Sequence, residues 1–274
     1  PFSMLRFAIT VVPAFALLLS LPAWSAELTL LRTFDSRGPS GLAYDDRFCG
    51  IWIANETRSI KLVTPYGDEI MGFESNLSRV DAIAIQENHL VLSDGNGLYQ
   101  QVDRMGNELG APYRLSGALV DTDGLFVDST TNDYWVADDS IAALVRISHD
   151  GKVSQRIEGA EQAMPLMEPQ GVTRDPVSGN LLVVDDADAS DSLFEFSAEG
   201  ELLDVIPLAM GGRDAEGITI QPETKTLFIA YDDGDVVAAF RYSPTISDDT
   251  HLASTTPGGC VLSSLEPATD LPRG

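Results

Sequence analysis

The pattern of apolar and polar positions in this chain repeats five times. Each copy opens with a small residue and a short apolar alternation, then a polar turn, a second apolar run, an acidic turn and a third apolar run. Most copies add a Gly-containing hairpin and a weaker fourth run. Alternation with a period of two residues predicts β-strands. The five copies open at residues 41–45, 82–86, 124–128, 171–175 and 217–221, at steps of 41, 42, 47 and 46 residues.

A unit of four short strands in 40 to 50 residues is typical of a β-propeller blade. Such a blade cannot bury both of its faces alone, so it must stack on its neighbours. The sequence therefore predicts an all-β fold, a single β-propeller of four-stranded blades that spans residues 26–243. The chain has no room for a second domain of ordinary size.

The sequence also predicts how the ring closes. The fifth copy loses strand character at Ser243 and lacks its fourth strand, whereas residues 28–34 form one β-like run before the first copy. We expect this N-terminal strand to pair with the outer edge of the last blade, because an unpaired edge leaves ladder groups exposed. This closure favours five blades. A sixth blade is possible, since residues 27–38 and 244–274 together have a blade's length, but residues 254–260 are rich in turn formers.

The two ends of the chain lie outside the repeats. Residues 1–25 combine a basic start at Arg6, an apolar stretch and small residues before Ala26, which predicts a secretory signal peptide. The alternative is an uncleaved membrane anchor, but Pro13 and Pro22 interrupt the apolar run. We expect a periplasmic or secreted protein with no membrane span after cleavage, and residues 244–274 as a C-terminal tail.

The charge is strongly acidic. The chain has 42 acidic and 17 basic side chains, with a net charge of −25. Arg6 is the only charged side chain in the predicted signal peptide, so cleavage leaves the chain just as acidic. This charge would repel nucleic acid and anionic membrane surfaces, so neither is an expected partner. A cation, or a ligand held through one, is the natural complement. Acidity that only keeps an exported protein soluble is the alternative.

The chain has two cysteines, Cys49 and Cys260. Two thiols give no support for a thiolate metal site, but an exported protein permits a disulfide. A closed ring brings the first blade, with Cys49, beside the last blade, whose chain continues to Cys260. We therefore predict a disulfide between them. The alternative is two free thiols, one buried in a strand and one in the tail.

The fourth copy contains Pro169-Gln-Gly-Val, Asp175-Pro and the run 179–185. This phrase resembles an NHL-type repeat, and the resemblance extends to the wider group of SMP-30/gluconolactonase-like and SdiA-regulated propellers. It implies a propeller, commonly six-bladed, whose functional face often carries a divalent cation. The gluconolactonase-like family places a metal-binding Glu before the first blade's glycine, where this chain has Ser40. Glu216-Gly217 keeps the Glu-Gly pair in the last blade.

Acidic residues gather at two positions of the repeat that meet at one mouth of the central channel. The residue before each repeat start is Ser40, Asp81, Asp123, Gln170 or Glu216. The residue 14 positions after each start is Asn55, Asp138, Asp185 or Tyr231, and Asp94 takes this place in the shorter second copy.

Crowded carboxylates are costly unless they are paired, protonated or bound to a hard cation such as Ca²⁺. We therefore predict a divalent-cation site, for Ca²⁺ above other cations, whose candidate ligands are Asp81, Asp123, Glu216, Asp94 and Asp185. The alternative for acids after a strand is that they cap turns.

Other side chains near this mouth are candidates for ligand binding. The candidates are Arg37, Arg79, Arg213, Asn55, Asp138 and Tyr231. The three arginines lie within four residues of a repeat start and would hold a carboxylate or phosphate bidentately, or would neutralise the acids beside them.

The chain has no Gly-x-Ser-x-Gly elbow, phosphate-cradling loop or His-Glu-x-x-His motif, and its histidines, His89, His149 and His251, are expected away from the mouth. The first hypothesis is a monomeric, non-catalytic propeller that binds a small molecule or a protein on the acidic face. The second is a metal-dependent hydrolase of lactones, esters or phosphoesters, with Asp123 or Asp185 as the base.

Overall fold

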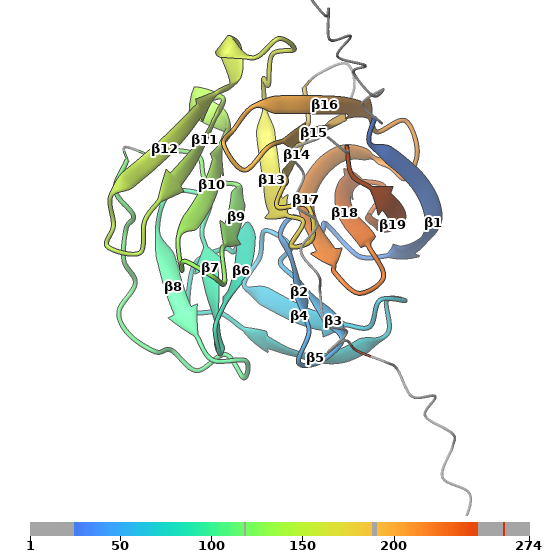
Figure 1. Cartoon of the computed structure of the whole chain (residues 1–274). Coiled ribbons are helices and arrows are strands. Elements are labelled where there is room, and N and C mark those ends of the chain that lie inside the picture. Colours follow the sequence, from blue (N-terminus) through green and yellow to red (C-terminus); the bar gives the residue numbers. More distant parts are fainter. Residues whose placement is uncertain (1–24, 118, 188–190, 246–259, 261–274) are drawn as a thin grey trace, which may run out of the picture.

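The structure, a computed structural model, describes residues 25–117, 119–187, 191–245 and 260. Five antiparallel β-sheets surround a central axis, and the innermost strand of each sheet lies near the centre (Figure 1). The only helices in the described residues are two short 3₁₀ turns, η1 (Asp139–Ile141) and η2 (Gly159–Glu161). The predicted all-β propeller with five blades is confirmed, and the six-bladed alternative is wrong.

The strands follow the repeat closely. Blade 1 contains β2 (Leu42–Asp45), β3 (Gly50–Ile53), β4 (Ser59–Val63) and β5 (Glu69–Glu74). Blade 2 contains β6 (Ala82–Gln86), β7 (His89–Ser93) and β8 (Tyr99–Val102). Blade 3 contains β9 (Gly124–Val127), β10 (Tyr134–Asp138), β11 (Ala143–Ile147) and β12 (Val153–Glu158). Blade 4 contains β13 (Pro169–Arg174), β14 (Leu181–Asp185), β15 (Ser192–Phe196) and β16 (Leu202–Pro207). Blade 5 contains β17 (Arg213–Gln221), β18 (Thr226–Asp233), β19 (Val236–Ser243) and β1 (Glu27–Asp35).

The fourth position of blade 2 is irregular. The chain after β8 returns along it and makes only isolated bridges, from Val102 to Glu108 and from Tyr99 to Tyr113. The backbone N–H groups of Tyr99 and Tyr113 donate to each other's carbonyl oxygens at 2.8 Å. The outer edge of β8 is therefore covered, although no regular fourth strand forms.

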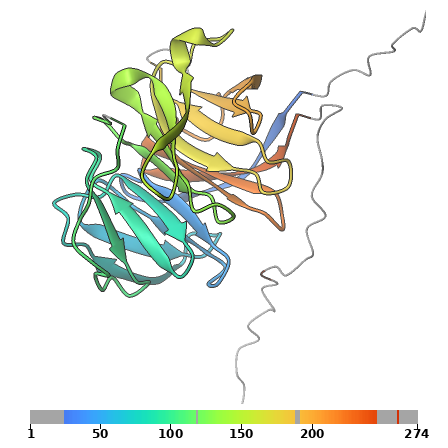
Figure 2. The ribbon, with the colours of Figure 1, turned by 60° about the vertical axis from the view of Figure 1, so that its left-hand side comes forward.

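The N-terminal strand closes the ring, as the sequence predicts. β1 pairs antiparallel with β19 from Glu27 opposite Ser243 to Asp35 opposite Val236, with a bulge between Leu30 and Arg32. Figure 2 shows β1, in blue, beside the last strands of the chain. β1 also reaches blade 1, because the Arg32 guanidinium donates to the Pro65 carbonyl at 2.6 Å and lies 4.4 Å from the centre of the Tyr66 ring.

The repeat glycines mark where neighbouring innermost strands come closest. A Cβ atom on Gly41 would lie 2.6 Å from the carbonyl oxygen of Asp81, the residue before the next repeat start. Gly124, Gly171 and Gly217 face the corresponding carbonyls of the next blade even more closely. We call this level of the channel the glycine ring. It explains why four of the five repeats start with glycine.

Substitution in the glycine ring tests this explanation. We expect Gly217→Ala to lower the free energy of unfolding by about 3 kcal/mol, because the new methyl group overlaps the Ser40 carbonyl. For a domain of this size the melting temperature falls by roughly 6–12 °C. The control is Ala82→Gly at the one repeat start that already tolerates a methyl group, where we expect a loss of about 1 kcal/mol. An equal loss of unfolding free energy in both variants would contradict the close approach of Gly217 to the Ser40 carbonyl.

Buried ion pairs tie neighbouring blades together. Asp45, at the end of β2, accepts hydrogen bonds from Trp52 Nε1 at 2.9 Å and from Arg104 Nε of blade 2 at 2.6 Å. Asp128, four residues into the third repeat as Asp45 is into the first, pairs with Arg174 of blade 4. Removing one partner of such a pair leaves a buried charge uncompensated, so these contacts help to fix how the blades stack.

The C-terminal tail is attached to blade 1. Cys260 forms a disulfide with Cys49 in the turn between β2 and β3, the pairing that the sequence predicts, and their Cα atoms lie 5.5 Å apart. Within the described residues no helix is long and apolar enough to cross a membrane. The predicted signal peptide, apart from Ser25, and most of the tail lie outside the described residues.

Candidate functional site

The acids that precede the repeat starts share one end of the channel, which we call the mouth. Asp81, Asp123 and Glu216 lie just before β6, just before β9 and within β17, on the N-terminal side of the glycine ring. Their carboxyl groups are close enough to affect one another. The charge of Asp123 raises the pKa of Glu216, and the charge of Asp81 raises the pKa of Asp123.

Two groups of three carboxylates form at the mouth. In each group one oxygen atom from every residue lies within 4.8 Å of the others. The Asp123 cluster consists of Asp121, Asp123 and Asp139, and the Glu216 cluster consists of Asp186, Asp214 and Glu216. Three oxygens at this spacing match the way carboxylates gather round a divalent cation.

The same short motif builds the core of both clusters. Asp121-Thr-Asp123-Gly124 and Asp214-Ala-Glu216-Gly217 each place two acids at alternate positions before a repeat glycine. In both motifs the two carboxylates come close together, with oxygen atoms within 4.8 Å of each other. Asp214 has a φ of +62°, a left-handed conformation that a non-glycine residue adopts only at some cost.

A third acid, which follows a second strand, completes each cluster. Asp139 comes directly after β10 in the same blade as its cluster partners. Asp186 comes directly after β14, in the blade before Asp214 and Glu216. The Glu216 cluster therefore joins two blades, whereas the Asp123 cluster belongs to one.

Burial and mutual repulsion disfavour the charged forms of these acids. Burial, followed by the charges of Asp214 and Asp123, raises the pKa of Glu216 to about 9. Burial and the charges of Asp121 and Asp81 raise the pKa of Asp123 to about 7. Burial and the contact with Asp214 also raise the pKa of Asp186. Without a cation, these buried acids therefore stay protonated at pH values at which ordinary carboxyl groups are ionised.

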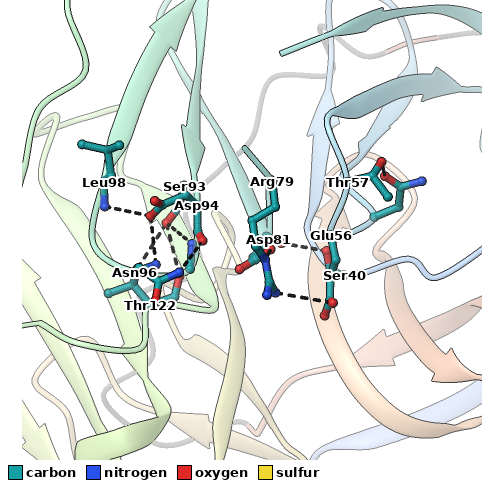
Figure 3. Close-up of polar contacts among 12 residues, drawn as sticks. Ser40, Glu56, Thr57, Arg79, Asp81, Ser93, Asp94, Asn96, Leu98 and Thr122 are labelled. Carbon is teal, nitrogen blue, oxygen red and sulfur yellow. Dashed lines mark hydrogen bonds and ion pairs between the residues drawn. The ribbon is translucent and has the colours of Figure 1, made fainter. Parts of the chain in front are cut away.

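Asp81 has an arginine partner that the other two acids lack. Arg79 Nε donates to Asp81 at 2.6 Å, and another guanidinium nitrogen lies 3.4 Å from Glu56 (Figure 3). Arg79 stands three residues before its repeat start, where the third and fifth repeats have Asp121 and Asp214. Burial still raises the pKa of Asp81, to about 6, but the arginine opposes the shift. Arg79 therefore neutralises neighbouring acids, and Asp81 belongs to neither cluster.

Two of the predicted acids that follow second strands, Asp138 and Asp185, accept hydrogen bonds from backbone N–H groups. Asp138 accepts from the N–H groups of Val120 at 2.7 Å and Asp121 at 3.4 Å. Asp185 accepts from Glu168 N–H at 2.6 Å. Both acids thus fasten the loop that leads into their own blade, and Asp138 positions the backbone of a member of the Asp123 cluster. Their role matches the alternative of turn capping.

The remaining candidates from the second strands also have local partners. Asp94 accepts from the N–H groups of Asn96 and Leu98 at 2.9 and 3.0 Å, within the turn drawn in Figure 3. Asn55 accepts from the Thr57 hydroxyl at 2.6 Å. Tyr231 is buried in the core, and its hydroxyl donates to the Met210 carbonyl at 3.5 Å.

The other two arginines do not enter the clusters. Arg37 is exposed in the loop between β1 and β2 and forms no ion pair within the described residues. The side chain of Arg213 is 86% exposed, and its guanidinium lies 4.0 Å from a carboxylate oxygen of Asp233. Both are exposed, so they stay candidates for contact with a ligand at the rim of the mouth.

A cavity of about 880 Å³ opens beside the Glu216 cluster. Its wall includes the acids Glu168, Asp186, Asp191, Asp214 and Asp233, the single base Arg213, and the apolar Leu208. This volume is ample for a small organic ligand. The cation cluster and the cavity share Asp186 and Asp214, so a cation bound there would face a ligand in the cavity.

The sequence reasoning missed Asp121 and Asp214 as site residues. Both occupy the third position before a repeat start, and the signal that would have found them is the repeated Asp-x-acid-Gly motif. Of the histidines in the described part of the chain, His89 lies at the first position of β7 and His149 in the turn after β11, both at the end of the ring away from the mouth.

Comparison with known proteins supports the fold alone. No model of a protein family matches the sequence, and no curated protein matches it. Among solved structures, a glutaminyl cyclase from Myxococcus xanthus is similar with a TM-score of 0.61 and 13% identity, over 80% of this chain and 97% of that one. A luciferin-regenerating enzyme has a TM-score of 0.56 and 11% identity, over 80% and 95% of the two chains. The WD40 propeller domain of Doa1 has a TM-score of 0.51 and 11% identity, over 74% and 78%. At this level of identity the similarities show the β-propeller fold alone and carry no function over to this chain.

Proposed function

We propose that this protein is an exported, monomeric β-propeller that binds a divalent cation, Ca²⁺ above others, at the acidic mouth, and through it a small-molecule or protein ligand. The observation that carries the proposal is the Glu216 cluster. Its three carboxylates lie within 4.8 Å of one another, none of them pairs with a basic side chain in the described part of the chain, and two of them, Asp186 and Asp214, line a large cavity. A hard cation with oxygen ligands would relieve their repulsion.

Two further features support a cation at this end of the ring. The repeat resembles NHL-type and SMP-30/gluconolactonase-like propellers, a group whose functional face often carries a divalent cation. The net charge of −25 also favours cations over anionic partners. Asp186, Asp214 and Glu216 would hold the ion, and Asp121, Asp123 and Asp139 offer a second place for one.

A metal-dependent hydrolase of lactones, esters or phosphoesters is the second candidate. It is favoured by Asp123, because a carboxyl group with a pKa of about 7 would exchange a proton with water at neutral pH. A bound cation would supply polarisation of a carbonyl or phosphoryl oxygen. We rank binding first, because no histidine in the described residues lies at the mouth to share the proton transfer.

Calcium addition to the metal-free protein tests the proposal. At a Ca²⁺ concentration of 100 times the dissociation constant, the folded state gains about 2.7 kcal/mol, and the melting temperature rises by roughly 5–10 °C. We expect Asp214→Asn to remove most of this rise and Asp123→Asn to remove a smaller part. Differential scanning calorimetry with and without chelator measures it.

The matched control is Glu199→Gln, which removes one exposed carboxylate at the other end of the ring and should leave the calcium response intact. A melting temperature that does not respond to millimolar Ca²⁺ or other divalent cations would contradict the cation site. Turnover of lactones or phosphoesters that stops in chelator would move the assignment to the hydrolase.

A further inference from the structure

A second cavity lies at the end of the channel opposite the mouth. Its volume is about 310 Å³, at the lower end of the range for small-molecule sites. All five innermost strands line it. From each repeat, the three residues directly after the repeat start contribute, and so does the fifth residue after the start, which lies in the turn at the end of the strand. We call it the funnel. All its residues lie on the C-terminal side of the glycine ring, whereas the acids of the mouth lie on the N-terminal side, so the two sites are separate.

The wall of the funnel is mainly apolar. The residue directly after each repeat start is a large aliphatic one, namely Leu42, Ile83, Leu125, Val172 and Ile218. The next position is Ala43 in blade 1, Ala84 in blade 2 and Phe126 in blade 3, and it is threonine in blades 4 and 5, Thr173 and Thr219. Small side chains on one side and an aromatic ring on the other leave room for an apolar body that is not symmetric about the channel axis.

The rim of the funnel carries uncompensated negative charge. The fifth residues of the repeats are Asp46, Glu87, Ser129, Pro176 and Pro222. Asp46 and Glu87 are exposed, and neither forms an ion pair within the described residues, although a carboxylate oxygen of Glu87 accepts a hydrogen bond from Asn132 Nδ2 at 3.0 Å. The one base of the funnel, Arg174, is bound to Asp128 and to the Gly179 carbonyl, so its charge is already balanced. Tyr44 and Phe126 add aromatic rings to the wall.

We propose that the funnel binds a small cationic amphiphile, an organic ammonium ion with a compact apolar body. The apolar body would displace water from the aliphatic wall, which is favourable in proportion to the area buried. The ammonium group would lie at the rim near Asp46 and Glu87, and aromatic rings also attract such a cation. An anionic amphiphile of the same shape would meet two carboxylates and no free base.

The test compares two probes of one shape and opposite charge, 1-naphthylmethylammonium and 1-naphthylacetate, by isothermal titration calorimetry on the full-length protein without added metal. We expect saturable binding of the ammonium probe with at least tenfold preference over the carboxylate probe. The double variant Asp46→Asn/Glu87→Gln should weaken the ammonium probe about tenfold and reduce the preference. Ala84→Leu, which fills the funnel, should abolish binding of both.

Controls separate the funnel from other sites. Glu199→Gln, which removes one carboxylate charge at the same end of the ring but away from the rim, should leave binding unchanged, and so should Asp214→Asn at the mouth. Equal affinity for both probes would overturn the proposal, as would a loss of binding in Asp214→Asn that matches the rim variant. Unchanged melting temperatures of the rim variants exclude unfolding as the cause.

Discussion

A chain that lacks residues 27–35 is expected to lose cooperative unfolding and to aggregate. This deletion removes β1, and with it the partner of the whole outer edge of β19. An unpaired strand edge is a template for pairing with another chain. The deletion also removes the contacts of Arg32 with Pro65 and Tyr66, which join blade 5 to blade 1 where the ring closes.

The measurement is size-exclusion chromatography with circular dichroism during heating. A chain that begins at Ala26 is the control, because it keeps β1 and also the hydrogen bond from Ala26 N to Asp204 at 2.8 Å. We expect this control to be monomeric and to unfold in one transition. If the deletion variant did the same at an unchanged melting temperature, ring closure by β1 would not be what holds the propeller together.

The architecture was predictable because every blade has the same geometry and therefore requires the same residue types at the same positions of each repeat. Each innermost strand must approach the next blade's backbone, which requires a small residue at a fixed place, and Gly41, Gly124, Gly171 and Gly217 meet that requirement. The last repeat lacks a fourth strand, and a single strand precedes the first repeat. Together these two features predict that the N-terminal strand completes the last blade. The disulfide between Cys49 and Cys260 follows from the same closure, since blade 1 carries Cys49 and lies beside blade 5, from which the chain continues to Cys260.

The candidate site was predictable only in part, because which acid has a partner depends on loops that the repeat does not fix. Asp81, Asp123 and Glu216 hold the same place in their repeats, yet Arg79 neutralises only the first of them. Asp185 looked like a ligand, but its carboxylate is turned back to the loop before β13, where it accepts backbone N–H groups. Sequence spacing gives the end of the ring at which a side chain lies, whereas its hydrogen bonds depend on the path of the neighbouring loop.

The pH dependence of stability gives a direct test of the crowded mouth. Glu216 has a pKa of about 9 in the folded protein, raised from 4.5 by burial first and then by the charges of Asp214, Asp123, Glu56 and Asp186. The folded state therefore holds this proton where the unfolded state has released it. Such a group contributes stability that is fully present below pH 4.5 and is lost as the pH rises through about 9.

We accordingly expect Glu216→Gln to be more stable than the parent in metal-free buffer at pH 8, by on the order of 2 kcal/mol, with a melting temperature roughly 4–8 °C higher. At pH 4 the two proteins should melt together, because Glu216 is then uncharged in both the folded and unfolded states. Chemical denaturation between pH 4 and pH 9 measures the difference. Glu161→Gln, an exposed acid on the same end of the ring, should keep the pH profile of the parent.

Calcium should reverse the order of the two proteins. In the parent, cation binding at Asp186, Asp214 and Glu216 would replace the retained protons and restore stability at pH 8, whereas the variant has lost one of the three carboxylates. With saturating Ca²⁺ we therefore expect the parent to melt above Glu216→Gln. If the variant were less stable than the parent in metal-free buffer at every pH, Glu216 would be held by favourable contacts, and the repulsion on which the proposed cation site depends would not exist.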